Sequence, residues 1–271
     1  MRNPKLDESD LALCRSILYE ALALGFRPPT DETVSRLASE AGVSALADAA
    51  SVLDEAQGTE LARLIRRTLA PRVSPARLHS LAGLQTSFRR LFGHTARAGV
   101  PPYETEYGGD SLFQPPQEMS DLAGFYRAFG LVLQPSEHER IDHISCECEF
   151  LLFLARKEAY AFVRDEAASL EETHRADRFF LRHHLGQWGP AFGRRLARED
   201  RGGFYAALGG LLEAFVTSEC VRVGAPQGPE FLRLRSTSPG EAPMACGRAD
   251  DLLQIESPMS AGSPERTRRG Q

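Results

Sequence analysis

The stretch ERIDHISCECEFLLFLARKEAYA, residues 139–161, contains the longest helical pattern in the sequence and decides its fold class. Ile144, Cys148 and Leu152 recur four residues apart, which places them on one face of a helix. We therefore predict a helix over residues 138–163. The beginning of this segment, RIDHISCECEF, also gathers one His, two Cys, one Asp and two Glu, a composition typical of metal or redox sites.

Helical geometry argues against a metal site in this stretch. Residues two apart lie about 200° around a helix, so Cys146 and Cys148 face nearly opposite directions and cannot hold one ion together. His143 and Glu147, like Asp142 and Cys146, are four apart and share a face, but the zinc motif with that spacing needs two histidines. We therefore predict no metal and no cofactor here, and we expect Cys148 to pack in the core.

The rest of the chain continues the helical pattern. Further helical segments are predicted at about 10–24, 43–57, 59–70, 76–92, 117–129, 170–188, 190–199 and 203–222. Strand-type alternation is almost absent. From about Ser236 onward the chain is rich in Ser, Pro and Gly, which is typical of disordered segments. We predict an all-α protein with a single globular, bundle-like domain of about ten helices over residues 1–235 and a disordered tail over residues 236–271.

The composition is that of an ordinary soluble protein. The 271 residues carry a net charge of −5 with a pI near 5.9, which excludes a general nucleic-acid binder. The five cysteines are scattered and odd in number, which argues against a disulfide framework. The N-terminus shows no apolar signal segment, and no run approaches the ~18 apolar residues of a membrane span. We therefore predict a cytoplasmic location.

No catalytic constellation is evident in the sequence. Asp142, His143 and Ser145 cannot form a triad on one helix, because neighbours along a helix point apart. The G-x-S-x-G, P-loop and G-x-G-x-x-G motifs do not occur. The two histidines of FLRHHLGQW, residues 180–188, are expected on an amphipathic helix, one exposed and the other packed near the tryptophan. We predict that the protein is not an enzyme.

A long ordered loop is predicted over residues 94–116, HTARAGVPPYETEYGGDSLFQPP, because Pro and Gly pairs replace the helical pattern there. The loop holds Tyr103, Glu104, Glu106 and Tyr107. Aromatic residues beside carboxylates on a proline-stiffened loop suit a peptide-binding groove, in which apolar pockets supply affinity and carboxylates pair with arginine. We predict a peptide-binding function for this part of the chain.

The chain resembles the TorD/DmsD/NarJ family of cytoplasmic chaperones for molybdenum-cofactor oxidoreductases. The resemblance rests on five segments in the family's order: PPYETEYG, EMSDLAGFYRAFGL, ERIDHISCECEFLLFLARKEAYA, FLRHHLGQWGPAF and FYAALGGLLEAFV. The N-terminal LYEALALGFRPPTDE also matches, so the resemblance covers about residues 11–223. It is strongest to the TorD-like members that serve the dimethyl sulfoxide reductase superfamily.

The resemblance implies an all-helical fold and a dedicated chaperone. Such proteins bind the twin-arginine signal peptide and the apo catalytic subunit of their client enzyme until the cofactor is inserted, which prevents premature export. Weak guanine-nucleotide binding is associated with the family, although no phosphate-cradling motif in this sequence supports it. Some members exchange helices between protomers, so a monomer or a helix-swapped homodimer is expected.

The resemblance also assigns candidate binding residues. The family's Asp-His pair falls before the long helix, its next Glu falls inside that helix, and four more matches fall in the loop and in the helix that follows it. Together with a tyrosine of the loop, the predicted peptide-binding residues are Tyr103, Glu104, Tyr107, Asp121, Tyr126, Asp142, His143 and Glu147.

Two departures from the family pattern accompany these matches. Ile141 stands where the family usually has Pro, and Cys146 and Cys148 stand where it has aliphatic residues. The second departure favours burial of both cysteines and further weakens a metal site.

The resemblance suggests a binding mechanism and leaves one alternative. Glu104, Asp142 and Glu147 are expected to pair with the arginines of a signal peptide, while tyrosines line its apolar part. His143, titrating near neutrality, is expected to cap the long helix or orient a carboxylate. The alternative is a helical metal- or nucleotide-dependent enzyme that uses His143, Glu147 and the nearby cysteines. Metal analysis of the purified protein distinguishes the two.

Overall fold

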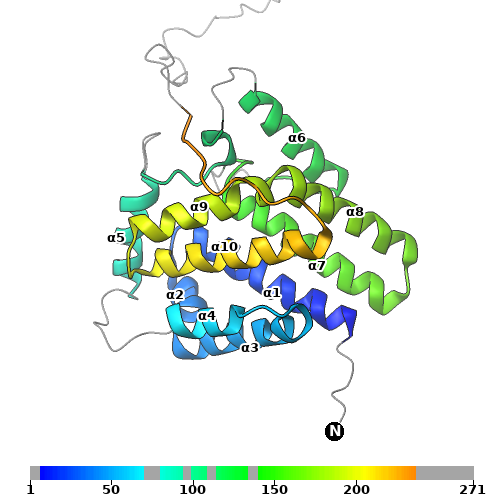
Figure 1. Ribbon diagram of the computed structural model, residues 1–271, viewed down its shortest axis with the longest axis horizontal. Coiled ribbons are helices and arrows are strands. Elements are labelled where there is room, and N and C mark those ends of the chain that lie inside the picture. The colour runs from blue at the N-terminus through cyan, green and yellow to red at the C-terminus, as the bar shows by residue number, and fades with distance from the viewer. Residues whose placement is uncertain (1–6, 70–79, 94–98, 109–113, 134–139, 236–271) are drawn as a thin grey trace, which may run out of the picture. The chain divides into compact units, whose positions relative to one another are not determined.

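The computed structural model describes residues 7–69, 80–93, 99–108, 114–133 and 140–235 (Figure 1). Its elements are α1 (Glu8–Phe26), α2 (Asp31–Leu37), α3 (Glu40–Gln57), α4 (Leu61–Thr68), α5 (Leu81–Phe92), the short 3-10 helix η1 (Glu104–Glu106), α6 (Gln114–Ala128), α7 (Ile144–Arg164), α8 (Ala167–His183), α9 (Leu185–Glu199) and α10 (Phe204–Val223). Over the described residues the chain forms ten α-helices and no β-strand, so the predicted fold class is confirmed. The predicted tail, 236–271, lies outside the described residues.

The α1 and α7 helices form an antiparallel pair in the centre of the fold. Arg15, near the start of α1, pairs with Glu158 in the second half of α7. Arg27, directly after α1, pairs with Glu149 near the start of α7. The first of these pairs is buried and the second is more than a third exposed, so the two helices meet both in the interior and at the surface.

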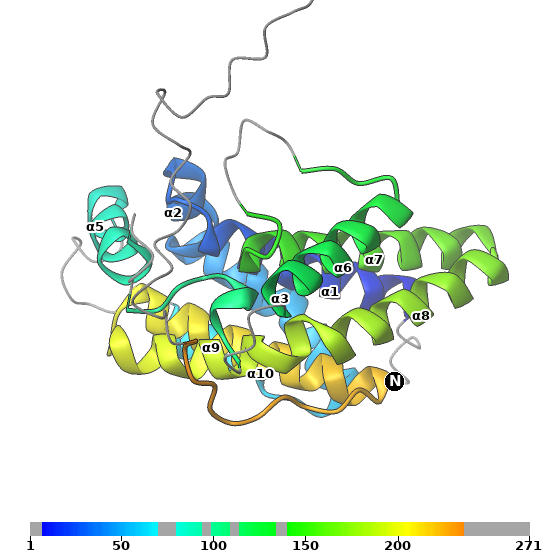
Figure 2. The same cartoon turned by 90° about the horizontal axis from the view of Figure 1, so that it is seen from above.

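The α9 and α10 helices cross at two glycines. A Cβ atom at Gly193 would lie 2.4 Å from the carbonyl oxygen of Gly209, and one at Gly209 would lie 2.6 Å from the carbonyl oxygen of Gly193. Any larger residue would therefore push the two helices apart. Seen from above, this pair lies beside α8, which in turn packs against α7 (Figure 2).

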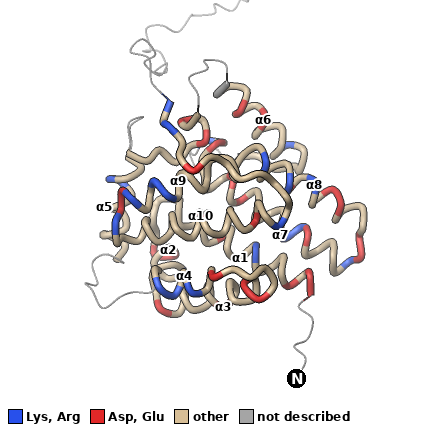
Figure 3. The backbone as a smooth tube through the Cα atoms, viewed as in Figure 1, with Lys and Arg blue, Asp and Glu red and all other residues tan. Residues whose placement is uncertain are grey.

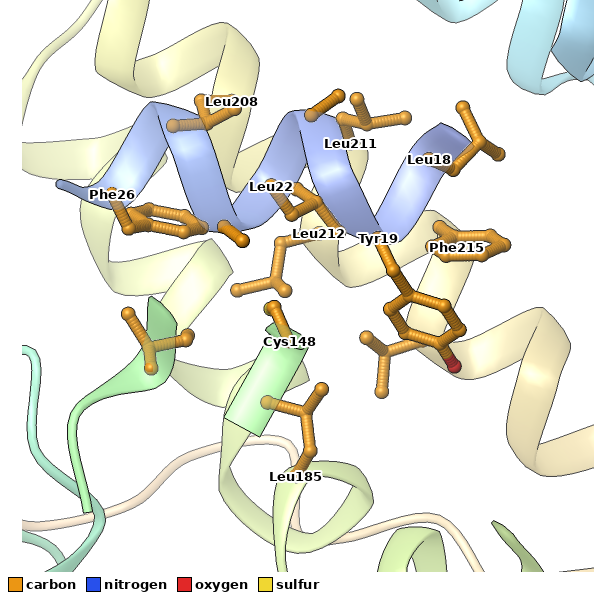
Figure 4. Close-up of a cluster of buried hydrophobic side chains, with 14 of the residues drawn as sticks. Leu18, Tyr19, Leu22, Phe26, Cys148, Leu185, Leu208, Leu211, Leu212 and Phe215 are labelled. Atoms are coloured by element: carbon orange, nitrogen blue, oxygen red, sulfur yellow. The ribbon is translucent and has the colours of Figure 1, made fainter. Parts of the chain in front are cut away.

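The core is built around apolar faces of α1 and α10. Leucines and aromatic rings of the two helices face each other in Figure 4, and Cys148 of α7 and Leu185 of α9 point into the same cluster. Cys148 is fully buried, as the sequence predicts. Burial also raises the pKa of its thiol well above the usual range, so this cysteine behaves as an apolar core residue.

Among the described residues, α10 is the one helix long and apolar enough to cross a membrane, judged by length and composition alone. Its mean hydropathy reaches 1.3 over an 18-residue window, and 61% of that window is buried inside the fold. Charged residues of both signs are spread over the other helices, whereas α10 carries few of them (Figure 3). The core position of α10 accounts for its apolar composition without a membrane.

The predicted helices at 170–188 and 190–199 divide at a different residue from the one expected. α8 ends at His183 and α9 begins at Leu185. His184 between them leaves the helical conformation, with φ −124° and ψ −110°. The prediction placed the break at the Gly-Pro step that follows Trp188, but that step lies inside α9.

The segment after α10, residues 225–235, returns along α9 and explains how that proline is tolerated (Figure 1). Pro190 has no N–H to donate to the carbonyl of Gly186, the helical acceptor four residues earlier. The backbone N–H of Gly228 donates to this carbonyl instead, at 3.2 Å. The returning segment thus replaces the hydrogen bond that the proline removes.

Candidate functional site

The loop after α5 and the start of α7 are held together by backbone hydrogen bonds. The N–H of Ile144 donates to the carbonyl of Pro102, and the N–H of Glu104 donates to the carbonyl of Asp142, both at 2.9 Å. These bonds form an isolated antiparallel bridge between Tyr103 and residue 143. The sequence-predicted residues of the loop and of the long helix are therefore neighbours in space.

Asp142 is fully buried and bonded on both carboxylate oxygens. Thr105 donates to it through its hydroxyl at 2.6 Å and through its backbone N–H at 3.2 Å. The guanidinium of Arg140 donates at 2.8 and 3.0 Å, and it also pairs with Glu106 at 3.1 Å. The side chain of Asp142 therefore holds the loop to the helix and is not exposed toward a ligand in this conformation.

His143 ends the extended segment and caps α7. Its Nδ1 accepts a hydrogen bond from the backbone N–H of Ser145 at 3.1 Å, so α7 begins at Ile144 and not near residue 138 as predicted. The expectation of a helix cap is confirmed. The expectation that His143 titrates near neutrality is wrong, because burial lowers its pKa to about 4.

Two glutamates reach from this region to the beginning of α9. Glu147 is fully buried and accepts a hydrogen bond from the indole N–H of Trp188 at 3.1 Å. Glu104 lies 3.2 Å from Nδ1 of His184, the residue between α8 and α9. Burial raises the pKa of Glu104 and raises that of Glu147 well above its usual range, since water cannot solvate the charged forms. We call Glu104, Asp142, His143 and Glu147 the motif cluster.

The predicted tyrosines surround the motif cluster at different depths. The hydroxyl of Tyr107 donates to the carbonyl of Pro101 at 2.8 Å, and its ring stacks on Trp188 with centroids 5.5 Å apart. Tyr126 is also buried and donates to the carbonyl of Ile141 at 3.3 Å. Tyr103 is half-buried, with the guanidinium of Arg140 4.3 Å from its ring centre.

Asp121 differs from the other predicted residues. It lies on the exposed face of α6 and accepts a hydrogen bond from Gln117 one turn earlier at 2.9 Å. The structure thus joins the predicted residues of the loop, of α7 and Tyr126, and leaves Asp121 on the surface. Their contact with a peptide stays a prediction.

Four further residues complete the cluster and were not predicted as site residues. They are Thr105, Arg140, His184 and Trp188. One of the two adjacent histidines was expected to be packed near the tryptophan, and the structure shows that it is His184, which is 4% exposed. The single tryptophan of the chain was the available signal, because a buried indole N–H needs an acceptor and Glu147 supplies one.

Beside the motif cluster lies a surface groove with a volume of about 460 Å³. It is formed by α1, α2, α7, Tyr126 of α6 and the segment after α6. Its floor and walls are apolar: Ala23, Leu24, Tyr126, Leu131, Val132, Leu133, Cys146, Phe150, Leu152 and Phe153. Val132 is 79% exposed, so the wall made by residues 131–133 presents apolar surface to solvent.

The rim of the groove carries three glutamates and three arginines: Glu20, Glu32, Glu149, Arg27, Arg36 and Arg156. They form four ion pairs with one another. Arg36 lies 3.1 Å from Glu20 and 3.2 Å from Glu32, Arg156 lies 3.0 Å from Glu20, and Arg27 pairs with Glu149. Every carboxylate on the rim is therefore already neutralised by an arginine of the same chain.

The groove and the motif cluster share a wall. Cys146 lines the groove, and its thiol lies 3.6 Å from the backbone carbonyl of Arg140. The guanidinium of the same arginine donates to Asp142. Tyr126 lines the groove and bonds to the residue before Asp142. Within the described ranges no group of three or more His, Cys, Asp or Glu residues has the geometry of a metal site.

Comparison with known proteins identifies relatives that match this chain over more than half of its length. Residues 43–194 match the model of the family described as nitrate reductase delta subunit. The perchlorate reductase assembly chaperone protein of Dechloromonas aromatica is 31% identical over 219 residues, which is 78% of this chain and 90% of the relative.

Two further relatives match over shorter regions. The selenate reductase assembly chaperone protein of Thauera selenatis is 36% identical over 137 residues, 48% of this chain and 66% of the relative. The chaperone protein TorD of Vibrio cholerae (strain El Tor Inaba N16961) is 30% identical over 138 residues, 50% of this chain and 60% of the relative. All three relatives are named as chaperones.

Proposed function

Since this chain belongs to the nitrate reductase delta subunit family, which includes the TorD and NarJ chaperones, we propose that it is a non-catalytic assembly chaperone for a molybdenum-cofactor reductase. The relatives whose names state a client assist a perchlorate reductase and a selenate reductase. The client of this chain is, in this proposal, the catalytic subunit of an oxidoreductase of the same chemical class.

The proposed binding event is capture of the apo catalytic subunit through its twin-arginine signal peptide, in the cytoplasm and before cofactor insertion and export. A signal peptide of this kind presents two adjacent arginines followed by an apolar stretch. The observation that supports the proposal is the groove, which combines an apolar floor with three glutamates on its rim. Apolar burial supplies affinity in such a complex, and arginine–carboxylate pairing supplies specificity.

The predicted site residues take two roles in this proposal. Tyr126 contacts the peptide directly, since it forms part of the groove wall. Asp142, His143 and Glu147 act as positioning residues, because their side chains are at most 1% exposed and fix the first turns of α7 below that wall.

The alternative of a metal- or nucleotide-dependent enzyme finds no support at the same residues. His143 and Glu147 are buried and engaged in the helix cap and in the bond to Trp188. Cys146 and Cys148 are buried as well, and Cys148 points into the apolar core. The named relatives are chaperones, and the chain is not an enzyme.

Isothermal titration calorimetry tests the proposal. The full chain is titrated with a synthetic peptide that carries two adjacent arginines followed by an apolar stretch. A peptide with the same composition in scrambled order serves as the control. Saturable binding of the first peptide, at least about tenfold tighter than binding of the scrambled peptide, is expected, which corresponds to about 1.4 kcal/mol. Equal or undetectable binding of both would contradict the proposal.

A further inference from the structure

The rim of the groove presents an apparent conflict with an arginine-rich ligand. Glu20, Glu32 and Glu149 suit guanidinium groups, but each already faces an arginine of this chain. A ligand arginine that pairs with both oxygens of one carboxylate displaces an arginine that is bound there, since Arg36 and Arg156 each occupy one oxygen of Glu20 and Arg27 occupies Oε1 of Glu149. The internal arginines therefore act as competitors of the ligand.

The geometry points to an arginine-exchange site: we infer that two adjacent arginines of the client peptide bind Glu20 and Glu149 after displacing Arg36 and Arg27. This inference rests on the proposed function and names the residues that recognise the peptide. The three glutamates and three arginines of the rim balance in charge, so the empty groove is electrically neutral.

Because the ion pairs on the rim are partly exposed, breaking them costs little free energy. Glu20 is 30% exposed, Glu149 is 37% exposed and Arg36 is 39% exposed. Ion pairs at this exposure contribute little to stability, because water solvates the separated charges almost as well. The displaced arginines regain full hydration, and the folded state loses little.

The two receptor carboxylates belong to the rim of one groove. Glu20 lies on α1, and Glu149 pairs with Arg27, the residue directly after that helix. Two long arginine side chains from consecutive residues diverge from the peptide backbone, so each can pair with its own carboxylate.

The floor between these two carboxylates is apolar and lies open. Leu24 of α1 and Leu152 and Phe153 of α7 line the same groove. Leu133, 38% exposed, completes the opposite wall. An apolar stretch that follows the two arginines would bury its side chains here, and unspecific apolar peptides would lack the charges needed to displace the rim arginines.

Arginine exchange makes an unusual prediction for the arginine variants. Arg27→Gln and Arg36→Gln remove competitors, so each is expected to bind the twin-arginine peptide about fivefold more tightly than the natural chain does. Glu20→Gln and Glu149→Gln remove receptors and leave an arginine that repels the peptide, so each is expected to bind about tenfold more weakly. If the rim ion pairs only stabilised the groove, all four variants would bind the peptide more weakly.

The salt dependence provides a second readout. In the natural chain the peptide replaces one ion pair with another, so added salt has little net effect on affinity. In Arg27→Gln the peptide adds an ion pair without breaking one, so its affinity should fall more steeply with salt. Arg175→Gln, which breaks a highly exposed pair with Glu171 on α8, is the matched control and should bind like the natural chain.

The experiment is calorimetry of the full chain and the five variants with the twin-arginine peptide, at low and at moderate salt. Tighter, more salt-sensitive binding by the two arginine variants supports the exchange site. Unchanged or weaker binding by Arg27→Gln and Arg36→Gln overturns it, even if the natural chain binds the peptide. A natural chain that binds no twin-arginine peptide contradicts the proposed function itself.

The same variants test whether a second copy of the chain occupies the groove. Sedimentation velocity of the natural chain and of Glu20→Gln is expected to give the same mass for both. A homodimer that dissociates when Glu20 is replaced would overturn the inference, because the groove would then be an interface between copies.

Discussion

Glu147 and Glu149 are two residues apart at the start of α7, and the structure uses them in opposite ways. Glu147 points inward, is fully buried and accepts the indole N–H of Trp188. Glu149 points to the groove, is 37% exposed and pairs with Arg27. One helix therefore contributes a carboxylate to the motif cluster from one face and a carboxylate to the groove rim from another.

The comparison separates what holds the site from what contacts a ligand. In the motif cluster the carboxylates are buried and hold fixed partners, so changes there should act on folding. On the rim the carboxylates and the arginines paired with them are partly exposed, so changes there should act on binding. Substitutions at four residues test this separation, beginning with the largest expected effect on stability.

Asp142→Ala should destabilise the fold by about 4 kcal/mol, because it leaves the guanidinium of Arg140 and the hydroxyl of Thr105 without their buried acceptor. Urea unfolding followed by circular dichroism measures this loss. If Asp142→Ala keeps full stability but loses peptide binding, Asp142 acts on binding as the rim carboxylates do, and the separation between buried and rim carboxylates is wrong.

His143 should make the fold sensitive to acid. Its pKa is lowered to about 4 in the folded chain from 6.5, so the unfolded chain binds the proton first. The contribution to stability is fully present above pH 6.5 and is lost as the pH falls toward 4, by up to about 3 kcal/mol. Urea midpoints measured across this range provide the test.

Two variants of His143 separate titration from capping. His143→Asn keeps an acceptor for the N–H of Ser145 and should remove the acid sensitivity while preserving stability at neutral pH. His143→Ala should also lose about 1 kcal/mol at neutral pH through the missing cap. An unchanged acid response in both variants would show that another group causes it.

Glu147→Gln should change the pH profile in the other direction. Burial raises the pKa of Glu147 well above 4.5, so the folded chain holds this proton more tightly than the unfolded chain does. Stability due to Glu147 is therefore present at low pH and is lost as the pH rises above 4.5 toward the raised pKa. The glutamine variant still accepts the indole N–H and should lose less stability than the natural chain over that rise. A steeper loss in the variant would contradict the raised pKa of Glu147.

Val132→Ser should have the smallest effect on folding. The side chain is 79% exposed, so the free energy of unfolding should change by less than about 0.5 kcal/mol. Binding of an apolar peptide should weaken by about 1 kcal/mol, since the groove wall loses apolar surface. Calorimetry and urea unfolding of the same sample measure the two effects. Unchanged binding would show that residues 131–133 do not contact the bound peptide.

The sequence predicted the helices well because their periodicity is local. The long helix, the buried Cys148 and the apolar α10 follow from residue spacing alone. The break at His184 did not, because the proline inside α9 is tolerated through a hydrogen bond from Gly228, which lies far along the chain. Local signals do not include such a partner.

The candidate site was predicted only in part, because its contacts also depend on residues far along the chain. The motif residues were found by resemblance, but their burial depends on α9, which supplies His184 and Trp188. The groove was not predicted at all. Its rim and floor come from α1, α2, α6, the segment after α6 and α7, and none of Glu20, Arg36 or Val132 stands out in its own sequence surroundings.

The returning segment 225–235 has a practical consequence for handling the protein. Its last residue, Arg235, donates to the carbonyl of Tyr107 and to Glu118 of α6, both at 3.0 Å. Gly108 has φ +116° and leaves room for that guanidinium, which would lie 3.2 Å from any Cβ there. Affinity tags and fluorescent reporters therefore belong after this arginine. A shortened chain that ends before it would lose the hydrogen bonds that hold the loop carrying Tyr103 and Glu104.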